Sequence, residues 1–193
     1  MTHTPRLFVI VGSPGSGKDL VVRAVNDLGS QHAQVVPKHT NRTRRNDDGN
    51  EMVCPGDDGH ALGNCDLVYE SFEDSYGIET ARIWQGLEHG VFQVVVVSKV
   101  EAINKLREIF GGLLVLVYVH SEVAPEQYRR MEAQFGDHGG YLDRRTSGYR
   151  DAYEVYLANF LAFDHVLIFS GQPEDLYDQA FRLFRAYERG LLY

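Results

Sequence analysis

A glycine-rich loop near the start of the chain has the residue types and spacing that bind phosphate. It runs from Gly12 to Asp19 with the pattern G-x-x-x-x-G-K. Glycines let successive backbone N–H groups turn toward one anion, and a following helix N-terminus adds positive potential. Lys18 would reach the β- and γ-phosphates of ATP. We therefore expect this loop to bind the nucleotide through Gly12, Ser13, Gly15, Ser16, Gly17, Lys18 and Asp19.

The segments on either side of the loop favour this interpretation over an ordinary surface turn. The apolar run Leu7–Val11 precedes the loop and predicts a buried strand, and Leu20–Leu28 follows it with a helical pattern. Strand, glycine loop and helix, in that order, are the context in which a phosphate-binding loop, or P-loop, works.

Asp19 departs from the usual pattern. A Ser or Thr normally follows the lysine, and its hydroxyl binds the Mg²⁺ that accompanies the nucleotide. A carboxylate is also a hard oxygen ligand, so Asp19 is predicted to bind Mg²⁺ directly or through water. It would repel bare phosphate, and the alternative is a degenerate loop that binds nucleotide poorly or not at all.

The charge of the chain narrows the class of partner. A formal net charge of -8 excludes the general basic surface of a nucleic-acid-binding protein. Positive charge is instead local, which suggests a small anionic ligand. One basic cluster contains Lys38, Arg42, Arg44 and Arg45, and a second contains Arg129, Arg130, Arg144, Arg145 and Arg150.

No apolar run approaches membrane-spanning length, and the first residues lack the apolar core of a signal peptide. We expect a cytoplasmic protein with no membrane or nucleic-acid partner, since ATP as substrate would require that location. The sequence assigns no oligomeric state.

The two cysteines, Cys54 and Cys65, bracket His60 in a segment rich in Gly and Asp. A zinc site there would need a fourth ligand, such as His39 or an Asp. Neither cysteine belongs to a C-x-x-C pair, and ordinary thiols in a loop are the simpler interpretation.

Apolar runs alternate with amphipathic segments along the chain, which predicts a parallel sheet covered by helices on both faces. The expected fold class is α/β, a P-loop three-layer fold in one domain spanning 1–193. Expected strands are Leu7–Val11, Ala33–Val36, Phe92–Val97, Leu113–Val119 and Val166–Phe169; expected helices are Leu20–Leu28, Val100–Phe110, Pro125–Phe135 and Pro173–Tyr187. The core is expected to comprise 5–37, 67–135 and 149–190, with a polar acceptor-binding insert at 38–66 and a lid at 136–148.

From Leu7 to Tyr187 the chain resembles the guanylate kinase family of nucleoside monophosphate kinases. Four segments in the family's order carry the resemblance. They are the P-loop, Thr40–Arg45 followed by Gly49, Tyr69-Glu70 followed by Tyr76-Gly77-Ile78, and Phe163–Ile168.

The resemblance implies an ATP- and Mg²⁺-dependent kinase that phosphorylates GMP or a related nucleoside monophosphate. It implies that the acceptor is bound by Arg42, Arg45, Glu70, Tyr76 and Gly77. Arginines of the second basic cluster would close over the transferred group. The catalytic residues it implies are Lys18, Arg42, Arg130 and Arg145.

The sequence departs from the family pattern at several positions, and two alternatives to a nucleoside monophosphate kinase therefore remain open. Met52 stands where the family has a Tyr, and Ser98-Lys99 follow a strand that usually ends in acidic residues. Ribose 1,5-bisphosphate phosphokinases are similar in having a G-K-D loop and a shortened acceptor segment, so a sugar phosphate is the second acceptor considered. A guanylate-kinase-like domain that has lost catalysis and recognises a protein partner is the third possibility.

Overall fold

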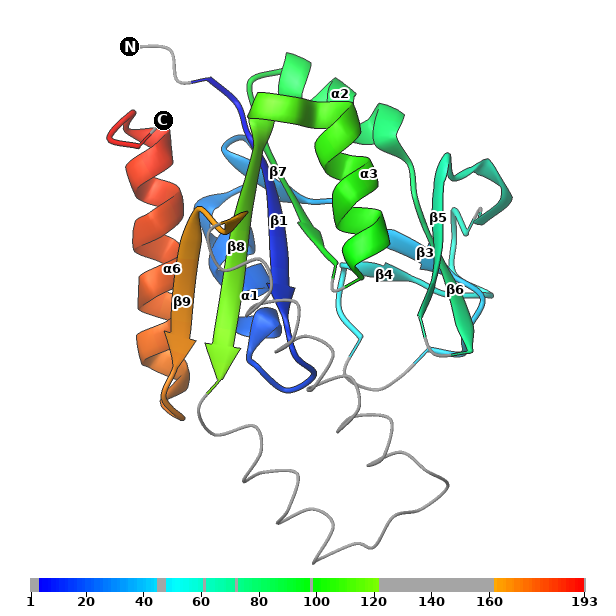
Figure 1. The fold of residues 1–193 in the computed structure, drawn as a ribbon, viewed down its shortest axis with the longest axis horizontal. Helices are drawn as coiled ribbons and strands as arrows, with labels where there is room; N and C mark the ends of the chain where they lie inside the picture. The colour runs from blue at the N-terminus through cyan, green and yellow to red at the C-terminus, as the bar shows by residue number, and fades with distance from the viewer. Residues whose placement is uncertain are drawn as a thin grey trace, which may run out of the picture.

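The computed structural model describes residues 4–44, 48–60, 62–71, 73–97, 99–121 and 162–192. Within them the main body is a five-stranded parallel sheet in the order β2-β7-β1-β8-β9 (Figure 1). The strands form where apolar runs were predicted, which confirms the α/β fold class. Their bounds are β1 Leu7–Gly12, β2 Ala33–Val35, β7 Phe92–Val96, β8 Leu114–Ser121 and β9 His165–Phe169.

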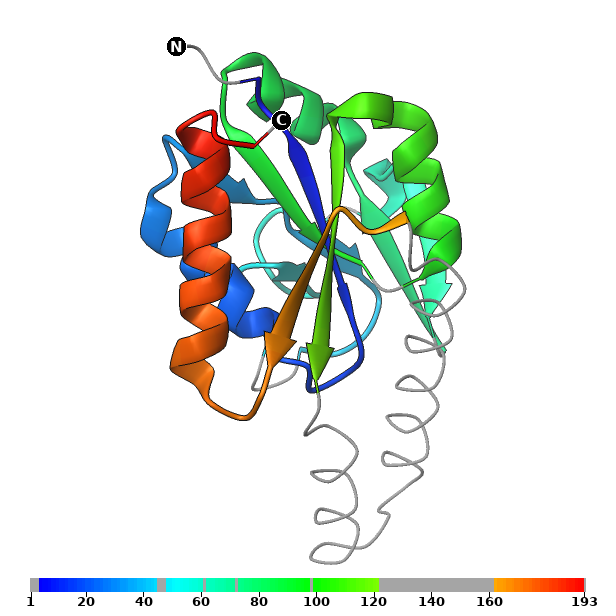
Figure 2. The same ribbon diagram turned by 60° about the vertical axis from the view of Figure 1, so that its left-hand side comes forward.

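Helices cover both faces of this sheet (Figure 2). Helices α1 (Lys18–Leu28) and α6 (Pro173–Glu188) pack with Phe8 and Ile10 of β1. Helices α2 (Thr80–Glu88) and α3 (Val100–Phe110) pack with the alternate β1 side chains, which point to the other face. Helix α2 was not predicted from the sequence. No helix in the described ranges is long and apolar enough to cross a membrane.

Phe8 is the centre of one face of the core. Its ring meets Phe184 and Tyr187 of α6 edge to face, with centroid distances of 4.8 Å and 4.9 Å. Edge-to-face pairs of this kind add stabilisation beyond the burial of apolar area. They hold α6 against β1 and therefore against the strand from which the P-loop emerges.

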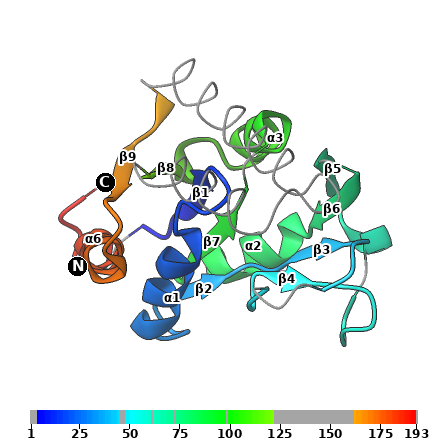
Figure 3. The ribbon, with the colours of Figure 1, turned by 90° about the horizontal axis from the view of Figure 1, so that it is seen from below.

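A second, smaller sheet lies beside the main one, in the order β4-β3-β6-β5 (Figure 3). Leu67, Tyr69 and Ile78 of this sheet share a buried cluster with α2 and α3, so the two sheets have a common core. The strands are β3 Lys38–Thr40, β4 Met52–Val53, β5 Leu67–Ser71 and β6 Asp74–Ile78, with the short 3-10 helix η1 (Leu62–Asn64) before β5.

The smaller sheet extends past residue 66, the expected end of the insert, because β5 and β6 form an antiparallel pair that joins β3. The expected lid at 136–148 and the expected helix Pro125–Phe135 lie outside the described residues.

Asp164 belongs to the segment Phe163–Ile168, one of the four that carry the family resemblance, and it has a structural role there. Its carboxylate accepts the N–H of Leu116 at 2.7 Å, and its own N–H donates to the carbonyl of Leu116 at 2.9 Å. The next residues along the chain, Val117 and His165, form the first pair in the parallel register of β8 with β9. The aspartate therefore fixes the edge strand against the sheet.

Candidate functional site

The P-loop leaves the carboxyl end of β1 and enters α1. Gly15 and Gly17 have φ angles of 73° and 87°, a left-handed conformation that favours glycine. A Cβ on Gly12 would lie 2.6 Å from Ser16 Oγ, and one on Gly17 would lie 2.6 Å from Leu176 Cδ2. The loop thus needs these glycines for its backbone angles and for its close packing.

Lys18 lies folded over this loop. Its Nζ donates to the carbonyl oxygens of Ser13 at 2.6 Å and Gly12 at 3.0 Å. The neighbouring side chain, Asp19, is exposed in the first turn of α1. The loop therefore combines a lysine held close to its backbone with an exposed carboxylate.

A cavity of about 330 Å³ lies between the P-loop and the smaller sheet. Its charged lining groups have both signs and come from both parts of the chain: Lys18 and Asp19 from one side, Lys38 and Arg42 from the other. Such a site can hold a phosphate group together with a cation. The described lining residues are Gly15, Gly17, Lys18, Asp19, Val22, Lys38, Arg42, Asp48, Glu51, Met52 and Val96.

Arg42 and Asp48 form a buried ion pair in the cavity wall, with side chains only 9% and 7% exposed. Arg42 Nη1 donates to Asp48 Oδ2 at 2.8 Å, and Nη2 donates to Oδ1. Burial opposes the charge on Arg42, but its hydrogen bonds to Asp48 and the charge of that carboxylate prevail, so the pKa of Arg42 is raised. Arg42 Nε is the buried side-chain donor that has no partner among the described residues.

Lys38 lies near Arg42 at the start of β3. Burial lowers the pKa of Lys38 to about 8, although the charge of Glu51 acts in the opposite direction. Its Nζ also lies 5.7 Å from the ring centroid of Tyr76. An anion in the cavity would favour protonated Lys38 and raise this pKa again.

Tyr76 and Tyr69 stack on one face of the β5–β6 hairpin, with ring centroids 5.6 Å apart. Glu70 projects from the opposite, exposed face of β5, where its Oε1 accepts a hydrogen bond from Ser75 Oγ at 2.7 Å. Glu70 does not belong to the described lining of the cavity.

Gly77 has a packing role in this sheet. It pairs with His39 across β3 and β6, and a Cβ on it would lie 2.6 Å from Cys65 Sγ. The missing side chain therefore leaves room for the Cys65 thiol. Neither Gly77 nor Tyr76 lies in the described lining of the cavity.

Several expected site residues lie outside the described residues: Arg45, Arg130 and Arg145, with Ser98, Arg129, Arg144 and Arg150. Conversely, Asp48 and Glu51 line the cavity and were not assigned a role from the sequence. The sequence did offer one signal for a role of these two carboxylates, because both lie in the polar insert beside the first basic cluster. Met52, noted as a departure from the family pattern, lines the cavity with a buried side chain.

The cysteines lie in different surroundings. Cys54 Sγ lies 3.8 Å from Asp48 Oδ2, and His60 Nε2 lies 2.7 Å from the carbonyl oxygen of Thr40. Cys65 instead lies beside His39 and Glu79. Burial, with the charge of Glu79, raises the pKa of the Cys65 thiol to about 11.

Comparison of the sequence with models of known protein families, and with curated proteins, found no match. Solved structures do share the fold. A guanylate kinase from Anaplasma phagocytophilum has a TM-score of 0.63 and 16% identity, covering 96% of this chain and 87% of that one. A gluconokinase from Sinorhizobium meliloti 1021 has a TM-score of 0.53 and 16% identity, covering 98% and 97%.

These similarities define the class of structure. The protein has a P-loop kinase-like fold, similar to guanylate kinase and gluconokinase at low sequence identity. The parallel sheet with its flanking helices and the separate small sheet are both part of this fold. The function must be argued from the site.

Proposed function

We propose that the protein is an ATP-dependent kinase that transfers the γ-phosphoryl group to a phosphorylated small molecule. The observation that carries the proposal is the cavity itself. It brings Lys18 and Asp19 of the P-loop together with Lys38 and Arg42 of the smaller sheet and the loop after it. Phosphoryl transfer depends mainly on positioning two phosphate-bearing molecules and neutralising their charge. The charged side chains of the cavity lining suit both tasks.

The P-loop would hold the donor. Its backbone and Lys18 would bind the phosphates of ATP, for which Lys18 must exchange its present bonds to the loop carbonyls. The exposed carboxylate of Asp19, in the cavity lining, suits Mg²⁺ as a hard oxygen ligand. When bound, Mg²⁺ would neutralise phosphate charge that Asp19 alone would repel.

The smaller sheet and its following loop would hold the acceptor phosphate. Arg42 would contribute its guanidinium, which belongs to a residue of the cavity lining and is held in place by Asp48. Lys38 adds a second positive charge beside it. Arg45, Arg130 and Arg145 remain proposed contributors, as the family resemblance implies.

A nucleoside monophosphate, with GMP first, is the acceptor we propose, supported by the structural similarity to a guanylate kinase. The position of Glu70 favours a second candidate, ribose 1,5-bisphosphate. Glu70 projects from the exposed face of β5, away from the face that carries Tyr76, and an acceptor without a base needs no such carboxylate.

An ADP-release assay tests the proposal with ATP, Mg²⁺ and one acceptor at a time: GMP, dGMP, AMP, CMP, UMP, ribose 1,5-bisphosphate or gluconate. Lys18→Ala should lower turnover by about a hundredfold or more, because a preorganised charge at the transition state is lost. Lys105→Ala, on the exposed side of α3, is the matched control and should retain full turnover.

Two outcomes separate the alternatives. Turnover with one acceptor that Lys18→Ala does not reduce would overturn the assignment of the P-loop. No ADP release, together with no rise in Tm on adding ATP and Mg²⁺, would overturn the kinase and favour the protein-recognition module.

A further inference from the structure

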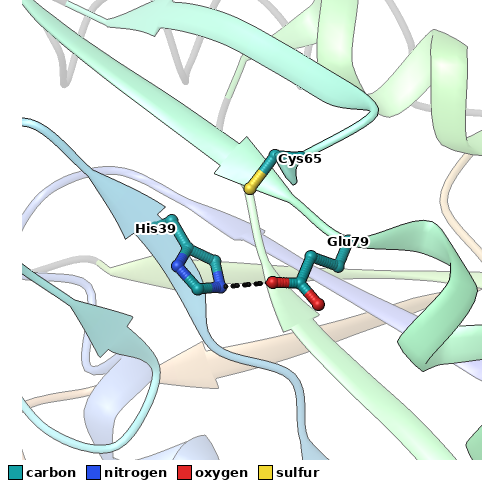
Figure 4. A group of neighbouring side chains, drawn as sticks. All are labelled: His39, Cys65 and Glu79. Atoms are coloured by element: carbon teal, nitrogen blue, oxygen red, sulfur yellow. Dashed lines mark ion pairs between the residues drawn. The ribbon is translucent and has the colours of Figure 1, made fainter. Parts of the chain in front are cut away.

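A second cluster of reactive side chains lies outside the kinase cavity, in the smaller sheet (Figure 4). His39 is the central residue of β3, Cys65 lies between η1 and β5, and Glu79 lies between β6 and α2. None of the three belongs to the described lining of the cavity. The proposed function therefore leaves this cluster without a role.

The three side chains converge on one point from separate elements. One ligand atom from each, a nitrogen, a sulfur and a carboxylate oxygen, lies within 4.8 Å of the other two. His39 Nε2 and Glu79 Oε1 are 3.1 Å apart, and the His39 side chain is only 4% exposed. Figure 4 shows the imidazole and carboxylate facing each other with the sulfur above them.

These separations are near the spacing that a tetrahedral metal ion requires. With metal–ligand bonds of 2.0–2.3 Å, neighbouring ligand atoms lie about 3.3–3.8 Å apart. The observed spacing would reach that range through small side-chain rotations.

The surroundings of the cluster make room for the sulfur and include negatively charged side chains. Gly77 pairs with His39, and its lack of a side chain leaves the space that Cys65 Sγ occupies. Asp66, next to Cys65, is fixed by accepting the N–H of Thr80 at 2.8 Å. Two carboxylates, those of Glu79 and Asp66, thus act on the Cys65 thiol and would attract a cation, against the opposing charge of Arg82 near His39.

We propose that His39, Cys65 and Glu79 bind one divalent transition-metal ion, with Zn²⁺ as the expected metal and one coordination position left for water or another ligand. Mixed nitrogen, sulfur and oxygen ligands are typical of Zn²⁺, whereas Mg²⁺ and Ca²⁺ take oxygen ligands. Binding forms a metal–sulfur bond and releases the thiol proton of Cys65 to solvent.

Such an ion would join β3, the segment before β5 and the start of α2. Because His39 follows Lys38 in β3, it would also stabilise the strand that carries one wall of the cavity. The proposed role is structural and does not depend on the kinase reaction.

Cobalt binding tests the site in the full chain. The protein is freed of metal with a chelator and titrated with Co²⁺, and thiolate-to-cobalt charge-transfer absorption is recorded. We expect saturation at one equivalent and loss of the absorption when Zn²⁺ is added. Cys65→Ser should abolish this absorption, whereas Cys54→Ser should retain it. These are the only two cysteines of the chain, so Cys54→Ser is the matched control.

The other two ligands have their own variants. His39→Gln and Glu79→Gln should each weaken Co²⁺ affinity by more than tenfold, because each removes a direct ligand from a site of three. Lys18→Ala should bind Co²⁺ as the wild type does, so failure of the metal site and failure of the kinase proposal are distinguishable.

Absence of thiolate-to-cobalt absorption in the wild type would overturn the proposal, as would its retention in Cys65→Ser or its loss in folded Cys54→Ser. If Cys65→Ser fails to fold, thiol labelling of the wild type replaces it, with the modified cysteine identified by mass spectrometry. Zn²⁺ should slow labelling of Cys65 at least tenfold and leave Cys54 unchanged. Equal labelling of Cys65 with and without Zn²⁺ would overturn the proposal.

Discussion

Asp48→Asn is the substitution that most directly tests the structure of the cavity. Asp48 is buried against Arg42, whose guanidinium donates to both of its carboxylate oxygens. Asparagine keeps the size of the side chain but removes the negative charge and one acceptor oxygen. Arg42, with its raised pKa, remains charged and loses the partner that compensates for its burial.

The expected cost follows from this burial. Removing one partner of a buried ion pair destabilises a protein by about 3–5 kcal/mol, and the remaining amide oxygen favours the lower end. For a chain of this length, 3 kcal/mol corresponds to a fall in Tm of roughly 6–12 °C. The pair of Lys105 with Glu101, whose side chains are 44% and 68% exposed, gives a matched control, because solvent screens this pair and Glu101→Gln should leave the Tm nearly unchanged.

Thermal and urea unfolding of the variants provide the measurement. The double variant Arg42→Met, Asp48→Leu should recover most of the lost stability, since replacing a buried pair with apolar residues is often neutral. Inorganic phosphate should raise the Tm of Asp48→Asn more than that of the wild type, because the released guanidinium can bind it. If Asp48→Asn is no more destabilising than Glu101→Gln, Arg42 and Asp48 are not a buried pair and the reasoning fails.

Three further predictions concern the same region. GMP affinity should fall as the pH rises through about 8, the pKa of Lys38, because the folded protein then loses the positive charge that lies beside the acceptor phosphate; Lys38→Gln should flatten this part of the pH profile in calorimetric titrations. Gly17→Ala should cost roughly 1–3 kcal/mol more in urea unfolding than Gly90→Ala, since both have positive φ but only Gly17 would collide with Leu176. Asp19→Ser should shift the Mg²⁺ concentration for half-maximal ADP release and leave the fold intact.

Each of these predictions has a contradicting result. An unchanged pH profile in Lys38→Gln would show that another group titrates near pH 8. Equal stability of Gly17→Ala and Gly90→Ala would mean that Leu176 does not pack against the loop. Identical Mg²⁺ titrations of the wild type and Asp19→Ser would show that Asp19 is not near the ion.

Local sequence patterns were sufficient for the main sheet and most of its described helices. The strand through Phe8 and helix α3 lie where the patterns predicted them. The smaller sheet was harder to predict because β3 and β4 are only three and two residues long. Strands that short form through pairing with distant partners, and hydrophobic periodicity does not reveal them.

The same distinction applies to the sites. By itself the sequence determined the strand, the glycine loop and the helix around Lys18, because these segments are consecutive and their backbone preferences are local. Only the tertiary structure decided that Asp48 pairs with Arg42, that Glu70 turns away from the face of Tyr76, and that Cys65 meets His39 and Glu79. Strand pairing brings Cys65, His39 and Glu79 together from distant positions in the sequence. Their chemistry therefore depends on contacts that no local pattern specifies.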